Sequence, residues 1–203
     1  MLHSPTRRHA AGFSLVEVLI SVVILSFGLL GMVGLQATSL QANREARLQA
    51  SGSELAREMG ELMRGNADAF FDPVTKVSLG TSPYYFTASS PTLTAPAPST
   101  CLNVGGTPCV NSTAIANAEI TDWLARVKDE LPGARVEICL DSTPFSGSGT
   151  PVWGCSAANG LPTVKIGWTR NSFKRASVQD SGQSFDFAST PGVVFTVDIG
   201  LDK

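Results

Sequence analysis

A long apolar run near the N-terminus constrains the fold of this chain more than any other feature. From Phe13 to Leu35 the sequence contains 23 residues, and Glu17 is the only charged residue among them. A helix of this length reaches about 34 Å, which is enough to cross a bilayer core of about 30 Å. The run therefore predicts a helix that spans a membrane or lies in an equally apolar assembly.

The residues before the run distinguish between kinds of membrane segment. Arg7 and Arg8 precede it without a neighbouring acid, and the small residues 10–12 also lie before it. A secretory signal peptide has a shorter apolar core, about 7–15 residues, with its small-residue cleavage site after the core. A plain single-span anchor with the arginines held in the cytoplasm is a second alternative. Neither alternative explains the carboxylate of Glu17.

Glu17 needs a positive partner in an apolar environment. A charge at the bilayer centre costs about 2.5–3.5 kcal/mol on insertion scales, and such residues tend to be paired and functional. If the chain is cut between Gly12 and Phe13, the new α-amino group lies one helical turn from Glu17. The helix N-terminus favours the carboxylate within one subunit, and the amine of one subunit could neutralise Glu17 of its neighbour. Glu17 is therefore predicted to pair subunits.

The stretch "GFSLVEVLISVVIL" resembles the signature of type IV pilins and related pseudopilins. That signature comprises a short basic leader, a Gly before the cut, an N-methylated Phe after it and a Glu four residues further on. The resemblance implies that a prepilin peptidase cleaves after Gly12 and methylates the amine of Phe13. It also implies a head with an α+β fold, in which the upper part of the N-terminal helix lies against an antiparallel sheet.

Three further segments, "VEICLDSTP", "WGC" and "VKIGW", resemble the heads of minor pilins. This resemblance implies the major pilin and other minor pilins as partners, besides the prepilin peptidase. It implies a single-pass protein of the inner membrane, with its head in the periplasm, that later becomes part of the extracellular pilus. The expected role is structural, in starting or modifying filament assembly and so supporting motility and adhesion.

The helix is predicted to continue beyond Leu35, because the sequence turns polar without a helix breaker. Leu55, Met59, Leu62 and Met63 fall at i, i+4, i+7 and i+8 and form one apolar stripe. The Gly-Asn pair at 65–66 is a stop signal. The predicted organisation is a cleaved basic leader at 1–12, a transmembrane and assembly segment at 13–35, a polar amphipathic helical segment at 36–65 and a globular head at 66–203.

The head shows one further helical pattern and three strand patterns. Residues 80–100 contain four prolines and many hydroxyl side chains, which indicates a loop; a sugar attachment site there is a less favoured alternative. Residues 114–131 have helical spacing of apolar side chains and end at a Pro-Gly pair. Apolar and polar residues alternate at 134–140, 163–169 and 193–199, which predicts an antiparallel sheet with one wet face.

The four cysteines, Cys101, Cys109, Cys139 and Cys155, lack the close paired spacing of a zinc ribbon. Because the head of a pilin-like chain is exported, disulfides are the better interpretation. Four cysteines allow three pairings, and the sequence alone does not choose among them. Local loop closure favours Cys101 with Cys109 and Cys139 with Cys155. No metal and no cofactor are predicted.

Composition weighs against an enzyme and against a nucleic-acid binder. Both histidines, His3 and His9, precede the apolar run, so removal of the leader would leave no histidine for a catalytic triad or a metal site. The chain has 15 Lys and Arg against 17 Asp and Glu, so it lacks the basic excess typical of nucleic-acid binding. A membrane-anchored enzyme would need a catalytic set without histidine.

A small basic cluster supports the rival interpretation as a binding module. Arg170, Lys174 and Arg175 follow the second alternating segment, near two aromatic residues. Arginine and aromatic side chains together could hold single-stranded nucleic acid, so an adhesin or DNA receptor displayed on the pilus is one alternative. A solvated turn is the favoured interpretation of this cluster. A minor pseudopilin of a type II secretion system is the other alternative.

Overall fold

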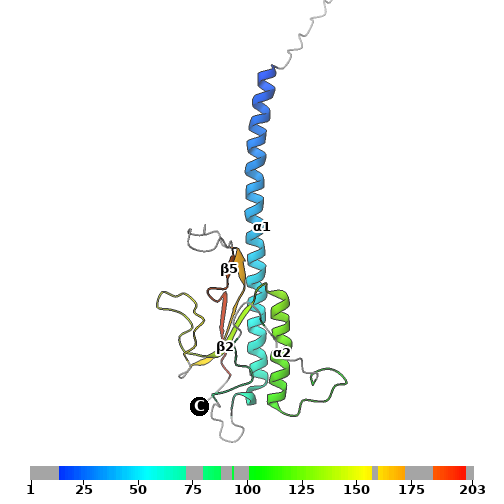
Figure 1. The fold of residues 1–203 in the computed structure, drawn as a ribbon, viewed down its shortest axis with the longest axis vertical. Helices are drawn as coiled ribbons and strands as arrows, with labels where there is room; N and C mark the ends of the chain where they lie inside the picture. Colours follow the sequence, from blue (N-terminus) through cyan, green and yellow to red (C-terminus); the bar gives the residue numbers. More distant parts are fainter. Residues whose placement is uncertain are drawn as a thin grey trace, which may run out of the picture. The chain divides into compact units, whose positions relative to one another are not determined.

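The computed structural model describes residues 14–71, 80–87, 93, 101–156, 160–171 and 185–199. Helix α1 runs without interruption from Leu15 to Gly65 (Figure 1). The predicted continuation of the helix through Leu35 is therefore confirmed. The chain divides into two compact units between Arg44 and Glu45, so the division falls after the point at which the sequence turns from apolar to polar.

The last third of α1 forms part of the core of the head. Leu55, Met59 and Met63 are almost fully buried, and Leu62 is partly buried against them. These four residues are the apolar stripe that the sequence predicts. The helix ends at Gly65 and is followed by a short 3-10 helix, η1, at Ala67–Ala69.

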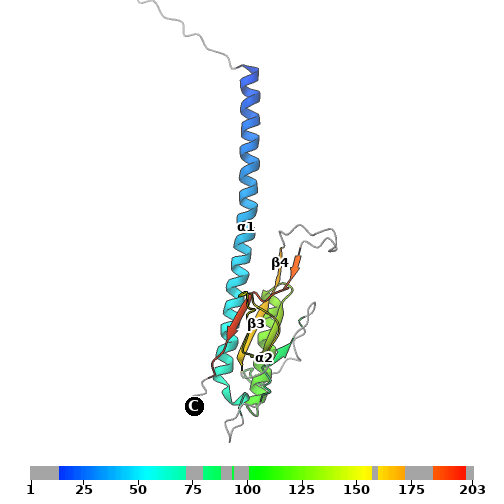
Figure 2. The ribbon, with the colours of Figure 1, turned by 90° about the vertical axis from the view of Figure 1, so that its left-hand side faces the viewer.

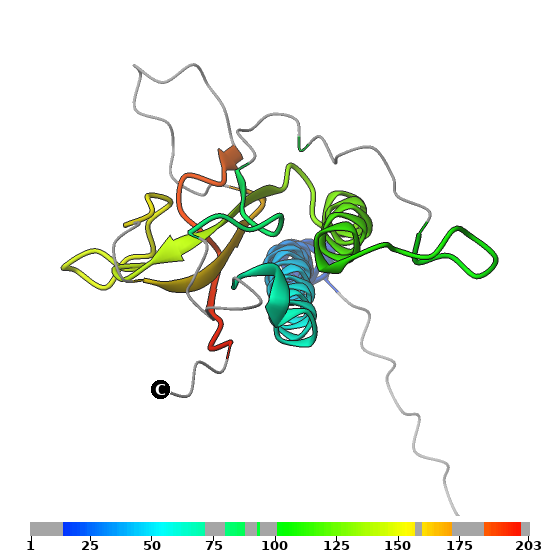
Figure 3. The same ribbon diagram turned by 90° about the horizontal axis from the view of Figure 1, so that it is seen from below.

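The second helix, α2, runs from Ser112 to Glu130 and confirms the helix predicted at 114–131. It begins at Asn111, whose side chain accepts a hydrogen bond of 2.8 Å from the backbone N–H of Ala114, an N-cap that satisfies one of the free donors of the first turn. Its Trp123 is fully buried and donates from the indole nitrogen to the carbonyl of Leu55 on α1, at 2.9 Å. Trp123 is therefore a core residue, and α1 and α2 run alongside each other in the head (Figures 1 and 3).

The head contains a four-stranded antiparallel sheet of order β1-β2-β3-β6. Its strands are β1 (Phe86–Thr87), β2 (Arg135–Asp141), β3 (Leu161–Gly167) and β6 (Val193–Thr196). The three predicted strands are confirmed. The additional strand β1 lies within residues 80–100, which were predicted to be a loop; it is two residues long and lies at the sheet edge, where a short pairing tolerates the surrounding sequence.

A second, two-stranded sheet is formed by β4 (Thr169–Asn171) and β5 (Phe185–Phe187). Strands of three residues are too short for alternation to identify them in a sequence.

One face of the four-stranded sheet packs on both helices, as Figure 3 shows from below and Figure 2 from the side of the sheet. Val136, Ile138, Val164 and Ile166 point to this face and are buried in one cluster with side chains of α1 and α2. The helices thus cover the sheet in the α+β, pilin-like architecture that was predicted.

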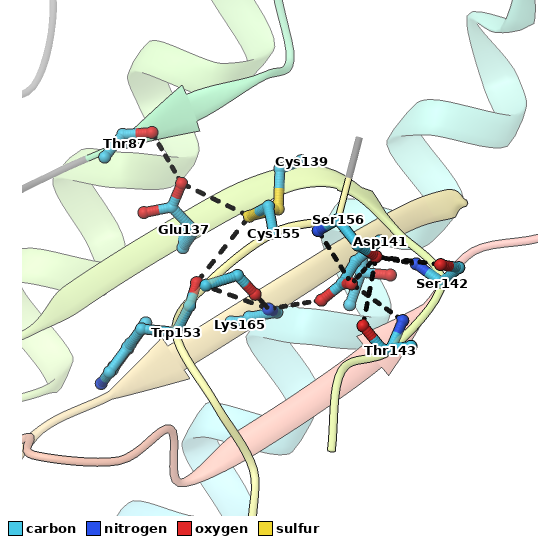
Figure 4. Close-up of a disulfide and its surroundings, with 12 residues drawn as sticks. Thr87, Glu137, Cys139, Asp141, Ser142, Thr143, Trp153, Cys155, Ser156 and Lys165 are labelled. Atoms are coloured by element: carbon cyan, nitrogen blue, oxygen red, sulfur yellow. Dashed lines mark hydrogen bonds and ion pairs between the residues drawn. A yellow bond between two sulfur atoms is a disulfide. The ribbon is translucent and has the colours of Figure 1, made fainter. Parts of the chain in front are cut away.

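The opposite face of the sheet corrects one prediction. Alternation predicts a wet face, but Glu137, Asp141, Thr163 and Lys165 on this face are all buried. The cause is the segment 142–156, here called the cover loop, which folds back over the sheet and is tied to β2 by the Cys139–Cys155 disulfide (Figure 4). The part of the outer face that carries these four residues is consequently covered as well.

Two glycines allow α1 to approach the sheet closely. A Cβ atom on Gly60 would lie 2.6 Å from ring atom Cε1 of Phe195, and one on Gly52 would lie 2.9 Å from ring atom Cζ3 of Trp168. These distances are too short for non-bonded carbon atoms. The absence of a side chain at both positions therefore sets the spacing between helix and sheet.

We expect Gly60→Ala to destabilise the head by about 1–2 kcal/mol, because overpacking outweighs the roughly 1 kcal/mol that alanine gains in a helix interior. Gly65→Ala is the matched control, since no atom lies within 4 Å of the position that its Cβ would take. Urea unfolding of both full-length variants in detergent, followed by tryptophan fluorescence, measures the difference. A Gly60→Ala variant as stable as the parent would contradict the close-packing argument.

Candidate functional site

Glu17 lies in the first turn of α1 with its side chain exposed. Its backbone N–H donates to the carbonyl of Ser14 at 3.0 Å, and Ser21 donates its hydroxyl to the carbonyl of Glu17 at 2.7 Å. The carboxylate is thus presented at the positive end of the helix dipole. Gly12 and Phe13, the predicted cleavage and methylation residues, lie outside the described residues.

The apolar part of α1 exposes its side chains on all sides. The large apolar residues from Leu15 to Leu35 are 45% to 85% exposed. By length and composition, α1 could cross a membrane, and none of its apolar window is buried within the chain. Contiguous apolar surface of this extent requires lipid or other apolar helices to cover it.

In the head, the outer face of the sheet carries a group that we name the covered polar cluster: Glu137, Asp141 and Lys165 (Figure 4). Glu137 and Asp141 lie on the same face of β2, and Lys165 on β3 lies directly opposite Glu137 in the antiparallel register. The side chains of Asp141 and Lys165 are 0% exposed, and Lys165 Nζ lies 2.6 Å from Asp141 Oδ2. Opposite charges are therefore held together without contact with water.

Three donors of the cover loop surround the other oxygen of Asp141. Oδ1 accepts hydrogen bonds from the backbone N–H of Thr143 at 2.9 Å, the backbone N–H of Ser156 at 3.2 Å and the hydroxyl of Ser156 at 2.7 Å. Burial alone would raise the pKa of Asp141. The neighbouring Lys165 and these donors outweigh burial and lower the pKa of Asp141 to about 2. Asp141 is thus a carboxylate at neutral pH.

Lys165 is enclosed by the C-terminal end of the cover loop. Its Nζ donates to the carbonyl of Gly154 at 2.6 Å and to the carbonyl of Trp153 at 3.4 Å. The indole of Trp153 in turn donates to the carbonyl of Ala188 at 2.9 Å, and the guanidinium of Arg135 lies 4.2 Å above the Trp153 ring. These contacts hold both ends of the cover loop over the cluster.

The sequence of the cover loop favours this compact conformation. Residues 142–156 contain no charged side chain, so the loop buries no charge of its own when it closes over the sheet. Its tip is a tight turn in which Ser146 N–H donates to Thr150 O and Gly149 N–H donates to Ser146 O, both at 2.8 Å. Gly149 has a φ of +78°, a conformation that glycine adopts without steric cost.

Glu137 lies beside the Cys139–Cys155 disulfide, where three atoms of the kinds that bind metals come close together. The ligand atoms of Glu137, Cys139 and Cys155 lie within 4.8 Å of one another. The two sulfur atoms are bonded to each other, however, and metal binding by cysteine requires thiolates. Glu137 Oε1 instead accepts a hydrogen bond of 2.7 Å from the hydroxyl of Thr87 on β1.

Both disulfides close local loops. Cys101 joins Cys109 and Cys139 joins Cys155, with Cα–Cα distances of 4.9 Å and 6.3 Å. This is the pairing that local closure favours. The Cys101–Cys109 loop has exposed apolar residues, including Leu102 and Val104, whereas the second disulfide ties down the cover loop.

The basic cluster is only partly described. Arg170 on β4 forms an ion pair of 3.1 Å with Glu45 of α1, and its guanidinium lies 4.8 Å above the ring of Trp168. Lys174 and Arg175 lie outside the described residues. The structure thus gives Arg170 two partners within the head, which any external ligand would have to displace.

A polar network links α1, α2 and the segment before β1. The buried hydroxyl of Tyr84 donates to the carboxylate of Glu119 and accepts a hydrogen bond of 3.2 Å from the side-chain amide of Asn66. Burial raises the pKa of Tyr84 well above its usual range, and the hydrogen bond to Glu119 adds to the shift. Burial also raises the pKa of Glu119, against the opposing effect of the Tyr84 hydroxyl. This network joins the C-terminal end of α1 to α2 and to the segment before β1.

The covered polar cluster is not predicted from the sequence. Alternation correctly places Glu137 and Lys165 on one face, but it does not show that a distant loop covers that face. A signal was present, because the uncharged loop 142–156 is bracketed by cysteines at 139 and 155.

Comparison with known proteins adds one finding. Residues 7–33 match the family model of the prokaryotic N-terminal methylation motif. This match supports a type IV pilin-like protein. Proteins with this motif are typically structural, and the motif together with the apolar helix is consistent with membrane anchoring and incorporation into a pilus. No curated protein and no solved structure matches the chain significantly.

Proposed function

We propose that this chain is a minor pilin of a type IV pilus, similar to the type IV pilus modification protein PilV. In this proposal a prepilin peptidase removes residues 1–12 and methylates the amine of Phe13. The mature protein stays in the inner membrane with its head in the periplasm, then enters the filament with the major pilin and other minor pilins.

The observation that carries the proposal is the coincidence of the methylation motif with an uncovered apolar helix. The motif covers residues 7–33, and the large apolar side chains from Leu15 to Val33 are exposed. A helix with apolar residues on every side is suited first to lipid and then to a bundle of like helices. Glu17 would provide the charge that aligns adjacent subunits.

The mass of the mature N-terminus tests the pathway. We expect protein purified from membranes of a strain with an active prepilin peptidase to begin at N-methylated Phe13. The matched control is the Gly12→Val variant, which should retain the leader because it carries a branched side chain at the cut. An intact leader in the parent protein, or a cut beyond Leu35, would contradict the proposal.

A deletion strain separates the two assembly systems that use this kind of helix. Loss of surface filaments with normal protein secretion supports a pilus role. Loss of secretion with normal filaments would instead assign the chain to a type II secretion system.

A further inference from the structure

We propose that Lys165 and Asp141 condense to form an intramolecular amide bond between Nζ and Cγ, which covalently links strands β3 and β2. The covered polar cluster would then be a self-modification site. This inference depends on the head alone and stands independently of the proposed pilus function.

The first argument is proximity without water. Nζ lies 2.6 Å from Oδ2, and both side chains are 0% exposed. Two reacting groups held in contact have a very high effective concentration, which favours an intramolecular reaction over the same reaction in solution.

The second argument is the arrangement around Oδ1. Two backbone N–H groups, from Thr143 and Ser156, and the Ser156 hydroxyl converge on this oxygen. Such a set of fixed donors is the arrangement that stabilises negative charge on a carbonyl oxygen during acyl transfer. Oδ1 can therefore carry the charge of a tetrahedral intermediate and remain as the amide oxygen, with all three donors retained.

The third argument is that the neighbouring carboxylate does not hold the amine. Glu137 lies opposite Lys165 in the strand register and four residues before Asp141 on the same face of β2. It is buried, and its Oε1 accepts a hydrogen bond of 2.7 Å from the hydroxyl of Thr87. The amine of Lys165 instead lies 2.6 Å from Oδ2 of Asp141, so the strands direct it to the carboxyl group that the donors of the cover loop surround.

The reaction balances without an added reactant. The ammonium of Lys165 and the carboxylate of Asp141 together hold the same protons as a neutral amine and a carboxylic acid, so one proton passes from Nζ to Oδ2. The amine electron pair attacks Cγ and forms the C–N bond. A second proton passes directly from the nitrogen to Oδ2, the oxygen that lies 2.6 Å from it in the structure, as the Cγ–Oδ2 bond breaks. The products are one amide and one water, and no oxidant or reductant is required.

Intact mass of the full-length protein in detergent tests the proposal. After reduction of both disulfides, the folded and aged protein should weigh less than its sequence by one water, about 18 Da. Tandem mass spectrometry of a digest should recover a branched peptide that joins the segments containing Asp141 and Lys165. The unreacted mass in a protein whose two disulfides have formed would overturn the proposal.

Two variants make the result specific. Lys165→Arg keeps a positive charge but cannot form this bond, and Asp141→Ala removes the carboxyl carbon that the amine attacks. Both variants should have the full mass that their sequences predict, without the loss of one water. If Lys165→Arg still lacks one water, the loss comes from another reaction, such as cyclisation of an aspartate with its own backbone, and the proposal is wrong. The mass of the parent protein alone decides the main result, so the proposal can be refuted even if a variant fails to fold.

Discussion

Glu17→Gln is expected to leave the head folded while reducing incorporation into filaments by at least about tenfold, since the pairing of a carboxylate with an amine in an apolar bundle is lost. Glu17 lies in the unit that ends at Arg44, and the core of the head is built from residue 45 onward. The substitution therefore removes a charge from the assembly segment without touching the head.

The measurement is the amount of the variant in sheared filaments relative to its amount in the membrane. Glu54→Gln is the matched control, because Glu54 is an exposed acid of the same helix within the head. Its incorporation should equal that of the parent. Glu17→Ala should behave like Glu17→Gln, and normal incorporation of both Glu17 variants would show that the carboxylate has no pairing role.

Removal of the Cys139–Cys155 disulfide is expected to destabilise the head by about 3 kcal/mol or more, from the chain-entropy effect of the closed loop. The paired substitutions Cys139→Ser and Cys155→Ser also release the cover loop from β2. Water would then reach the side chains of Asp141 and Lys165, which the loop encloses in the parent protein.

The Cys101–Cys109 disulfide provides the control. The sequence separations are 16 for Cys139–Cys155 and 8 for Cys101–Cys109, and a doubling of loop length changes the closure entropy by only about 0.6 kcal/mol. Closure entropy alone therefore predicts only a small difference between the two disulfides. Because the Cys139–Cys155 disulfide also holds the cover loop, we expect the free energies of unfolding of the two paired variants in urea to differ by more than about 1 kcal/mol. A gap no larger than the entropic difference would show that the cover loop adds nothing to stability beyond its closure.

The elements that could be predicted from the sequence are those whose pattern is local. The uninterrupted helix up to Gly65 follows from apolar spacing and the absence of breakers, and α2 follows from its spacing and its Pro-Gly end. Strands β2, β3 and β6 follow from strict alternation. Each of these signals lies within the element that it predicts.

The features that escaped prediction depend on contacts between distant segments. Alternation places Lys165 on the polar face of β3, but only the fold of residues 142–156 makes that face buried. Likewise, nothing near Arg170 in the sequence indicates its ion pair with Glu45, which lies more than a hundred residues earlier. The candidate site in the head is therefore a product of tertiary structure, whereas the motif around Glu17 can be read directly.

The glycine contacts between α1 and the sheet have a mechanical consequence. Gly52 and Gly60 are separated by about 12 Å along the helix axis, and each receives an aromatic ring of the sheet, from Trp168 and Phe195 respectively. These two contacts fix the position of the helix along its axis, because sliding the helix by one turn would push larger side chains into both rings. A pulling force on the head would accordingly be transmitted to the helix at two defined points. The helix would resist slipping until one of the rings moves away from its glycine.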